Sequence, residues 1–378
     1  MQELFKAAVE RGASDIHIKA GDFMRARIHG ELQPLTQQKL TVDQVRGIAL
    51  QLIPHEDERE NFDKILDYDC SWGIPGVGRF RVNIMKQRGS PMIIMRAIPI
   101  EIPSVEDLGL PPIVNRIAGF ERGLVLVTGV TGSGKSSTQA AMINWMNHHK
   151  QHHIVTLENP IEFLHRDNQC SITQRDIGTD TDSFQTGLRS VLRQDPDVIL
   201  IGEMRDKTTI ETALKASETG HLVISTLHTR NAVQTISRII AVFEPTEQEM
   251  IRVRLSESLQ AVISQRLVAK KEGGRVAAME VMLMTGTIRD CVRDADRMEE
   301  ISDLISEGRS VYGSQTFDQH LMELVKSGEV EFEVAKAAAN NPSDFDLQMN
   351  MLGTGPSGGG GPQGTQGLAD EMSNMMGS

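Results

Sequence analysis

Short apolar segments whose period changes repeatedly make up the first hundred residues. A helix is predicted to end near Gly12, because the apolar residues before it recur at helical spacing: Leu4, Phe5, Ala8 and Val9. A second helix is predicted over 43–53. The segments DIHIKA, MRARIHG, GVGRFRVNIMKQRG and PMIIMRAIPI are typical of strands bounded by turns. Together these elements predict a small α+β domain over residues 1–100.

Apolar strands that alternate with helices characterise the rest of the chain. The segment IPSVEDLGLPP breaks both periodicities and predicts a linker over 101–115. Beyond it, helices separate the apolar runs GLVLVTG, HIVTLENP, DVILIGE and LVISTLH, which indicates a largely parallel sheet covered on both faces. We expect an α/β domain over 116–352, with helices dominating from 246 to 345. The Gly-rich tail over 353–378 is predicted to be disordered.

Composition and charge narrow the classes of function. The 378 residues include 39 Lys and Arg against 51 Asp and Glu, which gives a net charge of −12. This acidic balance, together with an aromatic content of 4%, argues against nucleic acid as a partner. Cys70, Cys170 and Cys291 lie far apart, which indicates a reducing compartment rather than a disulfide framework. No apolar run is long enough to cross a bilayer, so we expect a cytoplasmic protein without a direct membrane span.

A phosphate-binding motif stands between the strand 124–127 and the helix that follows it. The segment from Gly129 to Ser136 fits G-x-x-x-x-G-K-[ST], in which glycines let consecutive backbone N–H groups turn toward phosphates. We expect Lys135 to reach the β- and γ-phosphates and Ser136 to ligate Mg²⁺. The residues predicted to bind ATP are Gly129, Val130, Thr131, Gly132, Ser133, Gly134, Lys135, Ser136 and Ser137.

Acidic residues end two further strands, where the metal-side carboxylate and the water-activating group are expected. The segment 197–203 is an apolar strand that ends in Glu203, which would hold the Mg²⁺ shell through water, although Gly202 stands where such motifs usually carry Asp. Glu158 and Glu162 flank Pro160 after another strand, and one of them is expected to act as the general base. The alternative for Glu162 is an acid at a helix N-terminus.

Histidines mark the next strand. His221 precedes it and His228 follows it, so His228 is predicted to face the same phosphate edge, whereas a structural role and a functional role stay equally open for His221. A second group forms a dense cluster at the end of the helix from Lys135, where solvated imidazoles are favoured over a metal site: His148, His149, His152 and His153.

These motifs resemble those of the secretion and type IV pilus ATPases, within which the chain is most similar to the pilus retraction branch. The segments that carry the resemblance are GVTGSGKSS, TLENPIEF, DPDVILIGEMRD and GHLVISTLHT. The resemblance implies a PAS-like first domain, a RecA-like second domain and ATP held between domains. It also implies that Glu162 orients the attacking water, that Glu203 lies on the Mg²⁺ side, and that Arg79 and Arg81 reach the γ-phosphate.

The function implied is that of a homo-hexameric ATPase motor at the inner face of the inner membrane. ATP-driven domain closure would turn an inner-membrane pilus platform protein and retract the pilus, the basis of twitching motility. The segment 287–291 departs from the family's retraction signature and keeps an accessory motor that depends on a paralogous retraction ATPase as an alternative, while Asn159, together with that segment, favours the scaffold named next. A nucleotide-gated scaffold with little hydrolysis and a RecA-like nucleic-acid motor are the rivals from other classes.

Overall fold

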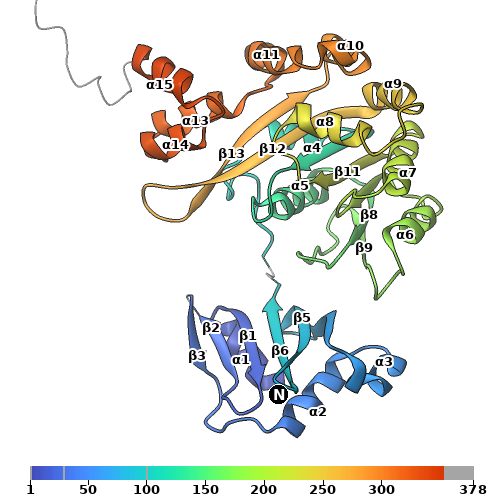
Figure 1. Cartoon of the computed structure of the whole chain (residues 1–378), viewed down its shortest axis with the longest axis vertical. Helices are drawn as coiled ribbons and strands as arrows, with labels where there is room; N and C mark the ends of the chain where they lie inside the picture. The colour runs from blue at the N-terminus through green and yellow to red at the C-terminus, as the bar shows by residue number, and fades with distance from the viewer. Residues whose placement is uncertain (1, 29, 99–100, 353–378) are drawn as a thin grey trace, which may run out of the picture. The chain divides into compact units, whose positions relative to one another are not determined.

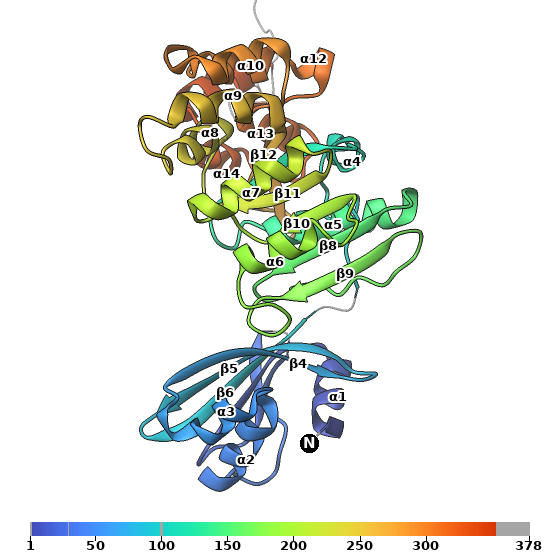
Figure 2. The ribbon, with the colours of Figure 1, turned by 90° about the vertical axis from the view of Figure 1, so that its right-hand side faces the viewer.

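An antiparallel sheet of six strands occupies the N-terminal part of the chain (Figure 1). The computed structural model describes residues 2–28, 30–98 and 101–352. The strands lie in the order β3-β2-β1-β6-β5-β4, with the bounds β1 (Ala13–Lys19), β2 (Arg25–Ile28), β3 (Glu31–Pro34), β4 (Asp67–Ile74), β5 (Gly78–Gln87) and β6 (Ser90–Ala97). The helices of this part are α1 (Gln2–Glu10), α2 (Val42–Leu52) and α3 (Glu56–Glu60), and α2 and α3 lie on one face of the sheet (Figure 2).

Alternation along β5 and β6 gives this sheet one apolar face and one polar face. Phe80, Val82 and Ile84 of β5 are buried and pack with Ile93 and Met95 of β6. The side chains between them point to the other face. The helix predicted over 43–53 matches α2 within one residue at each end. The sequence does not predict β4, because DYDCSWGI has no continuous apolar face and its pairing with β5 provides the missing stabilisation.

The predicted parallel sheet is present. Seven strands lie in the order β13-β12-β7-β11-β10-β8-β9, and β8 pairs in parallel with both β9 and β10, as β10 does with β11. The bounds of the first five in the chain are β7 (Gly123–Thr128), β8 (His153–Glu158), β9 (Ser171–Asp176), β10 (Val198–Ile201) and β11 (Leu222–Leu227). Every residue of β7, β10 and β11 is buried, as expected for strands covered on both faces.

The expectation that helices dominate from residue 246 to residue 345 is wrong over 259–283. Two long strands occupy most of that range, β12 (Leu259–Ala269) and β13 (Arg275–Leu283), which are orange in Figure 1. Eight of the nine residues of β13 are buried, so its sequence lacks the alternation of apolar and polar residues that marks a half-exposed strand. A continuous apolar run of this length fits a buried helix as well as a buried strand, which explains the error.

Helices surround the second sheet. They are α4 (Ile113–Ala118), α5 (Lys135–His149), α6 (Phe184–Val191), α7 (Lys207–Glu218), α8 (Ala232–Ile240), α9 (Gln248–Ser258), α10 (Gly286–Arg293), α11 (Glu300–Glu307), α12 (Arg309–Tyr312), α13 (Phe317–Lys326), α14 (Phe332–Ala338) and α15 (Pro342–Met351). Helix α4 begins within the last residues of the predicted linker. The described residues divide into two compact units, one within 2–127, 135–227 and 236–261 and the other within 128–134, 228–235 and 262–352. The tail predicted to be disordered lies outside the described residues.

Candidate nucleotide-binding site

The loop 129–134 connects β7 to α5 and has the backbone of a phosphate-binding loop. Gly129, Gly132 and Gly134 have φ values of 148°, 77° and 90°, in the region that L side chains rarely adopt. A Cβ atom added at Gly129 would lie 2.5 Å from the Gln265 carbonyl oxygen and 2.5 Å from Ser133 Oγ. Gln265 Nε2 in turn donates a hydrogen bond of 2.6 Å to the Ser133 carbonyl oxygen. The loop is therefore held closed by a strand neighbour and accepts only glycine at its first position.

The residues of this loop fit a bound phosphate group. Ser133 Oγ is buried and has no hydrogen-bond partner within the described chain, so it can donate to an anion held in the loop. Val130, Thr131 and Gly132 are exposed at the tip of the loop. Ser136 and Ser137 are half-buried in the first turn of α5, where the helix N-terminus favours negative charge.

Lys135 lies in the same electrostatic environment as the two predicted acids. Its side chain is half-buried, and desolvation lowers the pKa of Lys135, while the negative charges of Glu162 and Glu203 act in the opposite direction. The charges of both acids therefore act on Lys135, at the start of α5. Ser136 and Glu203 are the residues that would hold a Mg²⁺ ion in this arrangement, since oxygen ligands suit that ion.

Glu203 is oriented by an ion pair. It follows β10, its side chain is 19% exposed, and Arg205 Nε lies 2.7 Å from Glu203 Oε2. The preceding residue, Gly202, is fixed by two hydrogen bonds, from its N–H to Leu157 O and from Thr226 Oγ1 to its carbonyl oxygen. A Cβ atom at Gly202 would lie 3.3 Å from Leu157 O. β8 therefore approaches closely at the place where such motifs usually carry Asp.

Glu158 and Glu162 have different environments, which separates their roles. Thr156 Oγ1 and Gln174 Nε2 donate hydrogen bonds of 2.6 and 3.1 Å to Glu158 Oε1, and the backbone N–H of Glu162 also donates to that carboxylate. Burial raises the pKa of Glu158 against these hydrogen bonds. Glu162 is exposed. Glu158 thus anchors the loop, which the sequence does not predict, and Glu162 stays the candidate for the general base.

The two histidines at the ends of β11 also differ. His221 Nδ1 lies 2.9 Å from Ala216 O and 3.2 Å from Thr219 Oγ1, which is a structural role at the end of α7. His228 is exposed directly after β11. Thr229 and Thr235 share a hydrogen bond of 2.6 Å between their hydroxyl groups, and this contact fixes the segment that carries His228.

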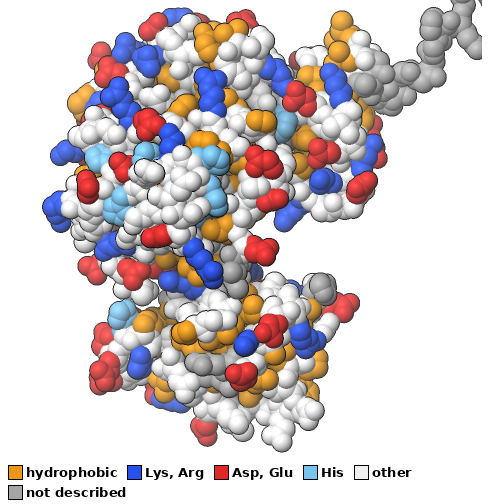
Figure 3. Space-filling model, turned by 180° about the vertical axis from the view of Figure 1, so that it is seen from behind, with side chains coloured by type: hydrophobic (Ala, Val, Ile, Leu, Met, Phe, Trp, Pro, Cys, Tyr) orange, Lys and Arg blue, Asp and Glu red, His pale blue; other side chains and the backbone are white. Residues whose placement is uncertain are grey.

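The histidines in the last turn of α5 and just after it do not converge on one point. His148 and His149 each place Nδ1 within 2.8 Å of a backbone carbonyl oxygen one helical turn earlier, and His153 Nδ1 contacts the Asp195 carbonyl oxygen. Figure 3 shows histidine side chains gathered on one face of the molecule. Within the described residues, no group of three or more His, Cys, Asp or Glu side chains is placed to hold a metal ion.

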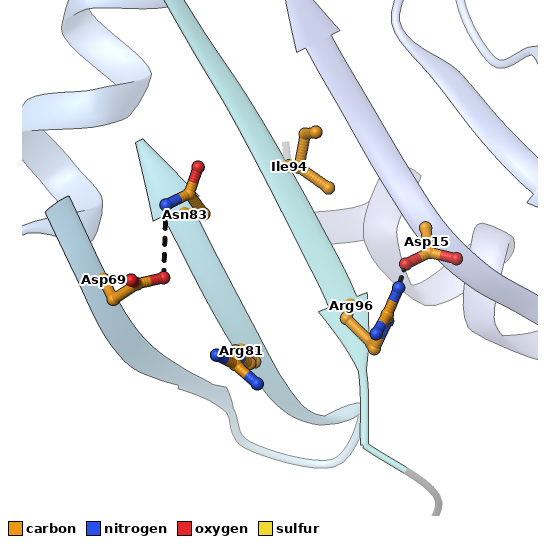
Figure 4. Close-up of a pocket in the computed structure, with 6 residues that line it drawn as sticks. All are labelled: Asp15, Asp69, Arg81, Asn83, Ile94 and Arg96. Atoms are coloured by element: carbon orange, nitrogen blue, oxygen red, sulfur yellow. Dashed lines mark hydrogen bonds and ion pairs between the residues drawn. The ribbon is translucent and has the colours of Figure 1, made fainter. Parts of the chain in front are cut away.

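Arg79 and Arg81 lie on the polar face of the N-terminal sheet. Arg79 Nη2 lies 2.7 Å from Asp176 Oδ2, which also accepts a hydrogen bond of 2.6 Å from Ser71 Oγ. Arg81 is exposed and points into a hollow of about 320 Å³. Two pairs flank it there, Asp15 with Arg96 and Asp69 with Asn83, and Arg81 is bonded to neither (Figure 4). Arg79 therefore forms an ion pair within its own chain, whereas Arg81 is exposed.

Comparison with known proteins identifies the family. The family model described as type II/IV secretion system protein matches residues 1–336. The chain belongs to this family. The type IV pilus retraction ATPase PilT of Pseudomonas aeruginosa is 44% identical over 343 residues, covering 91% of this chain and 99% of that protein. The type IV pilus ATPase PilU of the same organism is 38% identical, covering 93% and 91%.

A solved structure of the secretion-ATPase fold agrees with the architecture described above. The crystal structure of the pilus retraction motor PilT with bound ADP has a TM-score of 0.83 and 43% sequence identity, covering 91% of this chain and 98% of that one. This confirms the predicted fold class, a RecA-like P-loop domain with an N-terminal α+β domain. No helix in the described ranges is long and apolar enough to span a membrane.

Proposed function

We propose that this member of the type II/IV secretion system protein family is the ATPase that drives type IV pilus retraction. The observation that carries the proposal is a phosphate-binding loop followed by Lys135, on which the charges of Glu162 and Glu203 act, because phosphoryl transfer needs a cation on the phosphates and a carboxylate that can orient water. Similarity to PilT of Pseudomonas aeruginosa, over almost the full length of both chains, supports retraction as the work that hydrolysis drives.

Each residue has a separate task in this mechanism. The loop 129–134 binds phosphate oxygens through its backbone N–H groups and Ser133 Oγ, and Lys135 neutralises their charge. Glu162 orients the attacking water and accepts its proton, while Glu158 holds the Glu162 backbone in place. Mg²⁺, held by Ser136 and Glu203, would supply charge neutralisation at the phosphates. Arg81 and His228 stabilise the charge on the transferring phosphoryl group, and Arg79 joins them when it leaves Asp176.

The assembly proposed is a cytoplasmic homo-hexameric ring at the inner face of the inner membrane. We propose domain boundaries of 1–100 for the PAS-like domain, 101–115 for the linker and 116–352 for the RecA-like domain. Closure of the two domains around ATP would turn an inner-membrane pilus platform protein. Differential contacts with ATP and ADP must supply the bias between the open and closed states.

An accessory motor that depends on a paralogous retraction ATPase is the second candidate. Similarity to PilU is 38% over a comparable span, against 44% for PilT. The segment Thr287–Cys291, which departs from the retraction signature, forms α10, where Ile288 and Cys291 are buried while Thr287 and Asp290 are exposed. Two of the three departures, Thr287 and Asp290, therefore alter the surface and bear on partner choice, whereas the third, Cys291, lies in the core.

Two measurements test the proposal. The first is steady-state Mg²⁺-dependent ATP turnover of the purified chain, whose specific activity should rise with protein concentration and should not change when single-stranded DNA is added. Glu162→Gln should abolish this turnover and retain nucleotide binding. Expression in Pseudomonas aeruginosa that lacks PilT should restore twitching. Restoration that requires PilU would establish the accessory motor instead, and absence of turnover at every concentration would refute the enzyme.

A further inference from the structure

A buried carboxylate outside the proposed catalytic set lies beside the segment 228–235, called the histidine segment because it begins with His228. Glu280 is on β13 and is 5% exposed. Its Oε1 accepts a hydrogen bond of 2.7 Å from the backbone N–H of Ala232, the first residue of α8. Burying a carboxylate lowers the stability of the fold unless a specific interaction compensates the loss of solvation, so the question is what Glu280 holds in place.

The contact of Glu280 completes the fixation of the segment 228–235. Asn231 Oδ1 accepts the Gln234 N–H at 2.8 Å, and Thr235 Oγ1 donates to the Asn231 carbonyl oxygen at 2.7 Å. With the Thr229–Thr235 contact described above, these bonds define the first turn of α8 from within. The bond from Ala232 to Glu280 ties this turn to a different element, the strand β13.

Charged side chains of β12 and α13 act on the same carboxylate. Arg266 of β12 and Asp318 of α13 act on Glu280 electrostatically, and Arg266 lies over the ring of Phe317 with 3.9 Å between the guanidinium carbon and the ring centroid. Arg266 also donates to the Ala338 carbonyl oxygen and to Asn340 Oδ1, both at 2.6 Å. Glu280 is therefore positioned between the histidine segment and a packed helical cluster.

We propose that Glu280 is a positioning residue for ATP hydrolysis, which holds His228 in place by anchoring the first turn of α8 to β13. The inference rests on the proposed function, because it assigns Glu280 a task in the reaction of the same site. Glu280 does not touch the nucleotide in this scheme. Loss of its hydrogen bond leaves the Ala232 N–H buried without a partner and lets the turn that carries His228 shift.

The test is a double-mutant cycle between Glu280 and His228. Glu280→Ala should lower kcat about tenfold with little change in KM, because the lost interaction acts on the reacting state and not on nucleotide binding. His228→Ala should lower kcat as well, and the double variant should be no worse than His228→Ala alone. Glu280→Gln keeps an acceptor oxygen for the Ala232 N–H and should retain wild-type turnover within about twofold.

A matched control separates positioning from general stability. Thr316→Ala removes the capping box of α13, which lies in the same compact unit as Glu280. It should lower the free energy of unfolding about as much as Glu280→Ala does, without a change in the segment 228–235. It should leave kcat unchanged. Three results would each overturn the proposal. The first is a double variant whose loss in kcat is the product of the two single losses. The others are a loss in kcat for Thr316→Ala equal to that for Glu280→Ala, and wild-type turnover in His228→Ala.

Amide hydrogen exchange keeps the inference separate from the proposed function. Exchange at Ala232 and its neighbours should accelerate in Glu280→Ala and stay near the wild-type rate in Glu280→Gln and Thr316→Ala. An enzyme without ATP turnover refutes the proposed function, and with it the positioning role. An active enzyme whose exchange at Ala232 does not change in Glu280→Ala refutes the positioning role alone.

Discussion

Gly129 has the strictest steric requirement in the phosphate-binding loop. Its φ of 148° and the 2.5 Å approach of an added Cβ to Gln265 O exclude any side chain. Gly129→Ala should therefore open the loop and weaken ADP binding at least about tenfold, measured by titration with a fluorescent nucleotide. Gly286→Ala is the matched control, because nothing lies within 4 Å of its added Cβ and no unusual φ is required there. Equal affinities for the two variants would contradict the steric argument.

Two buried titratable groups make opposite contributions to stability as pH changes. Burial raises the pKa of Glu280 to about 7, whereas burial lowers the pKa of His320 to about 4. From pH 4.5 to 7 folded Glu280 keeps a proton that the unfolded chain has lost, so its contribution falls as pH rises. From pH 4 to 6.5 unfolded His320 binds a proton that the folded state excludes, so its contribution rises with pH.

Single substitutions should expose these opposite slopes. Glu280→Gln is expected to raise the free energy of unfolding relative to wild type by up to about 3 kcal/mol at pH 8 and to have little effect at pH 4.5. His320→Gln is expected to reduce the loss of stability below pH 6.5, because its side-chain oxygen can accept the Met279 N–H. Urea unfolding from pH 4.5 to 8 measures both, with exposed His148→Gln as control. Parallel pH profiles for wild type and Glu280→Gln would show that Glu280 titrates normally.

At this scale the sequence predicts which residue types gather at the strand ends but not how they divide the work. Gly129, Lys135 and Glu203 follow from motif spacing, because each is tied to the end of a recognisable element. The spacing of Glu158 and Glu162 does not distinguish them; the family resemblance points to Glu162, and the hydrogen bonds from Thr156 and Gln174 show that Glu158 is the anchor. The bond from Gln174 depends on the pairing of β8 with β9, which the local sequence around Glu158 does not show.

Among the elements, helix α6 depends on a glycine that allows close packing. A Cβ atom added at Gly187 would lie 2.9 Å from Leu157 Cδ2 of β8. Gly187→Ala should reduce the free energy of unfolding by about 1–3 kcal/mol, as overpacking in a core does. Gly47→Ala in α2 is the matched control, since the site is exposed and nothing lies within 4 Å. It should stabilise the chain by about 0.5–1 kcal/mol through helix propensity. Denaturant titration measures both variants. A change in the free energy of unfolding that has the same sign for both would refute this explanation.

The elements that the sequence predicts well are those whose burial pattern is strong and local. The buried strands β7, β10 and β11 are short and bounded by turns or helices, so their type and position follow from the sequence. β4 and β13 are missed for opposite reasons. β4 has too few buried residues to show a pattern, and β13 has so many that the pattern disappears. In both, pairing with a neighbouring strand decides the structure.

For the whole molecule, the two arginines of the N-terminal sheet differ in what they contact: one is paired within its own chain and the other is exposed. Arg79 is paired with Asp176 of its own chain, while Arg81 is exposed beside Asp69 and Asn83. In a ring, one subunit can present a residue to the site of the next, because head-to-tail interfaces join different surfaces. We expect Arg81 to serve the site of a neighbouring subunit.

Mixing two inactive variants tests this expectation. Arg81→Ala and Glu162→Gln should each reduce ATP turnover at least about a hundredfold alone, because each removes one component of the transition-state site. In an equal mixture, a site that takes Glu162 from one variant and Arg81 from the other is complete, so about a quarter of the sites should recover. Arg96→Ala, which removes another arginine from the same hollow, should stay active on its own. If the mixture is as inactive as its components although both assemble with wild type, Arg81 acts on the site of its own chain, and domain closure within one subunit must then bring it to the phosphate.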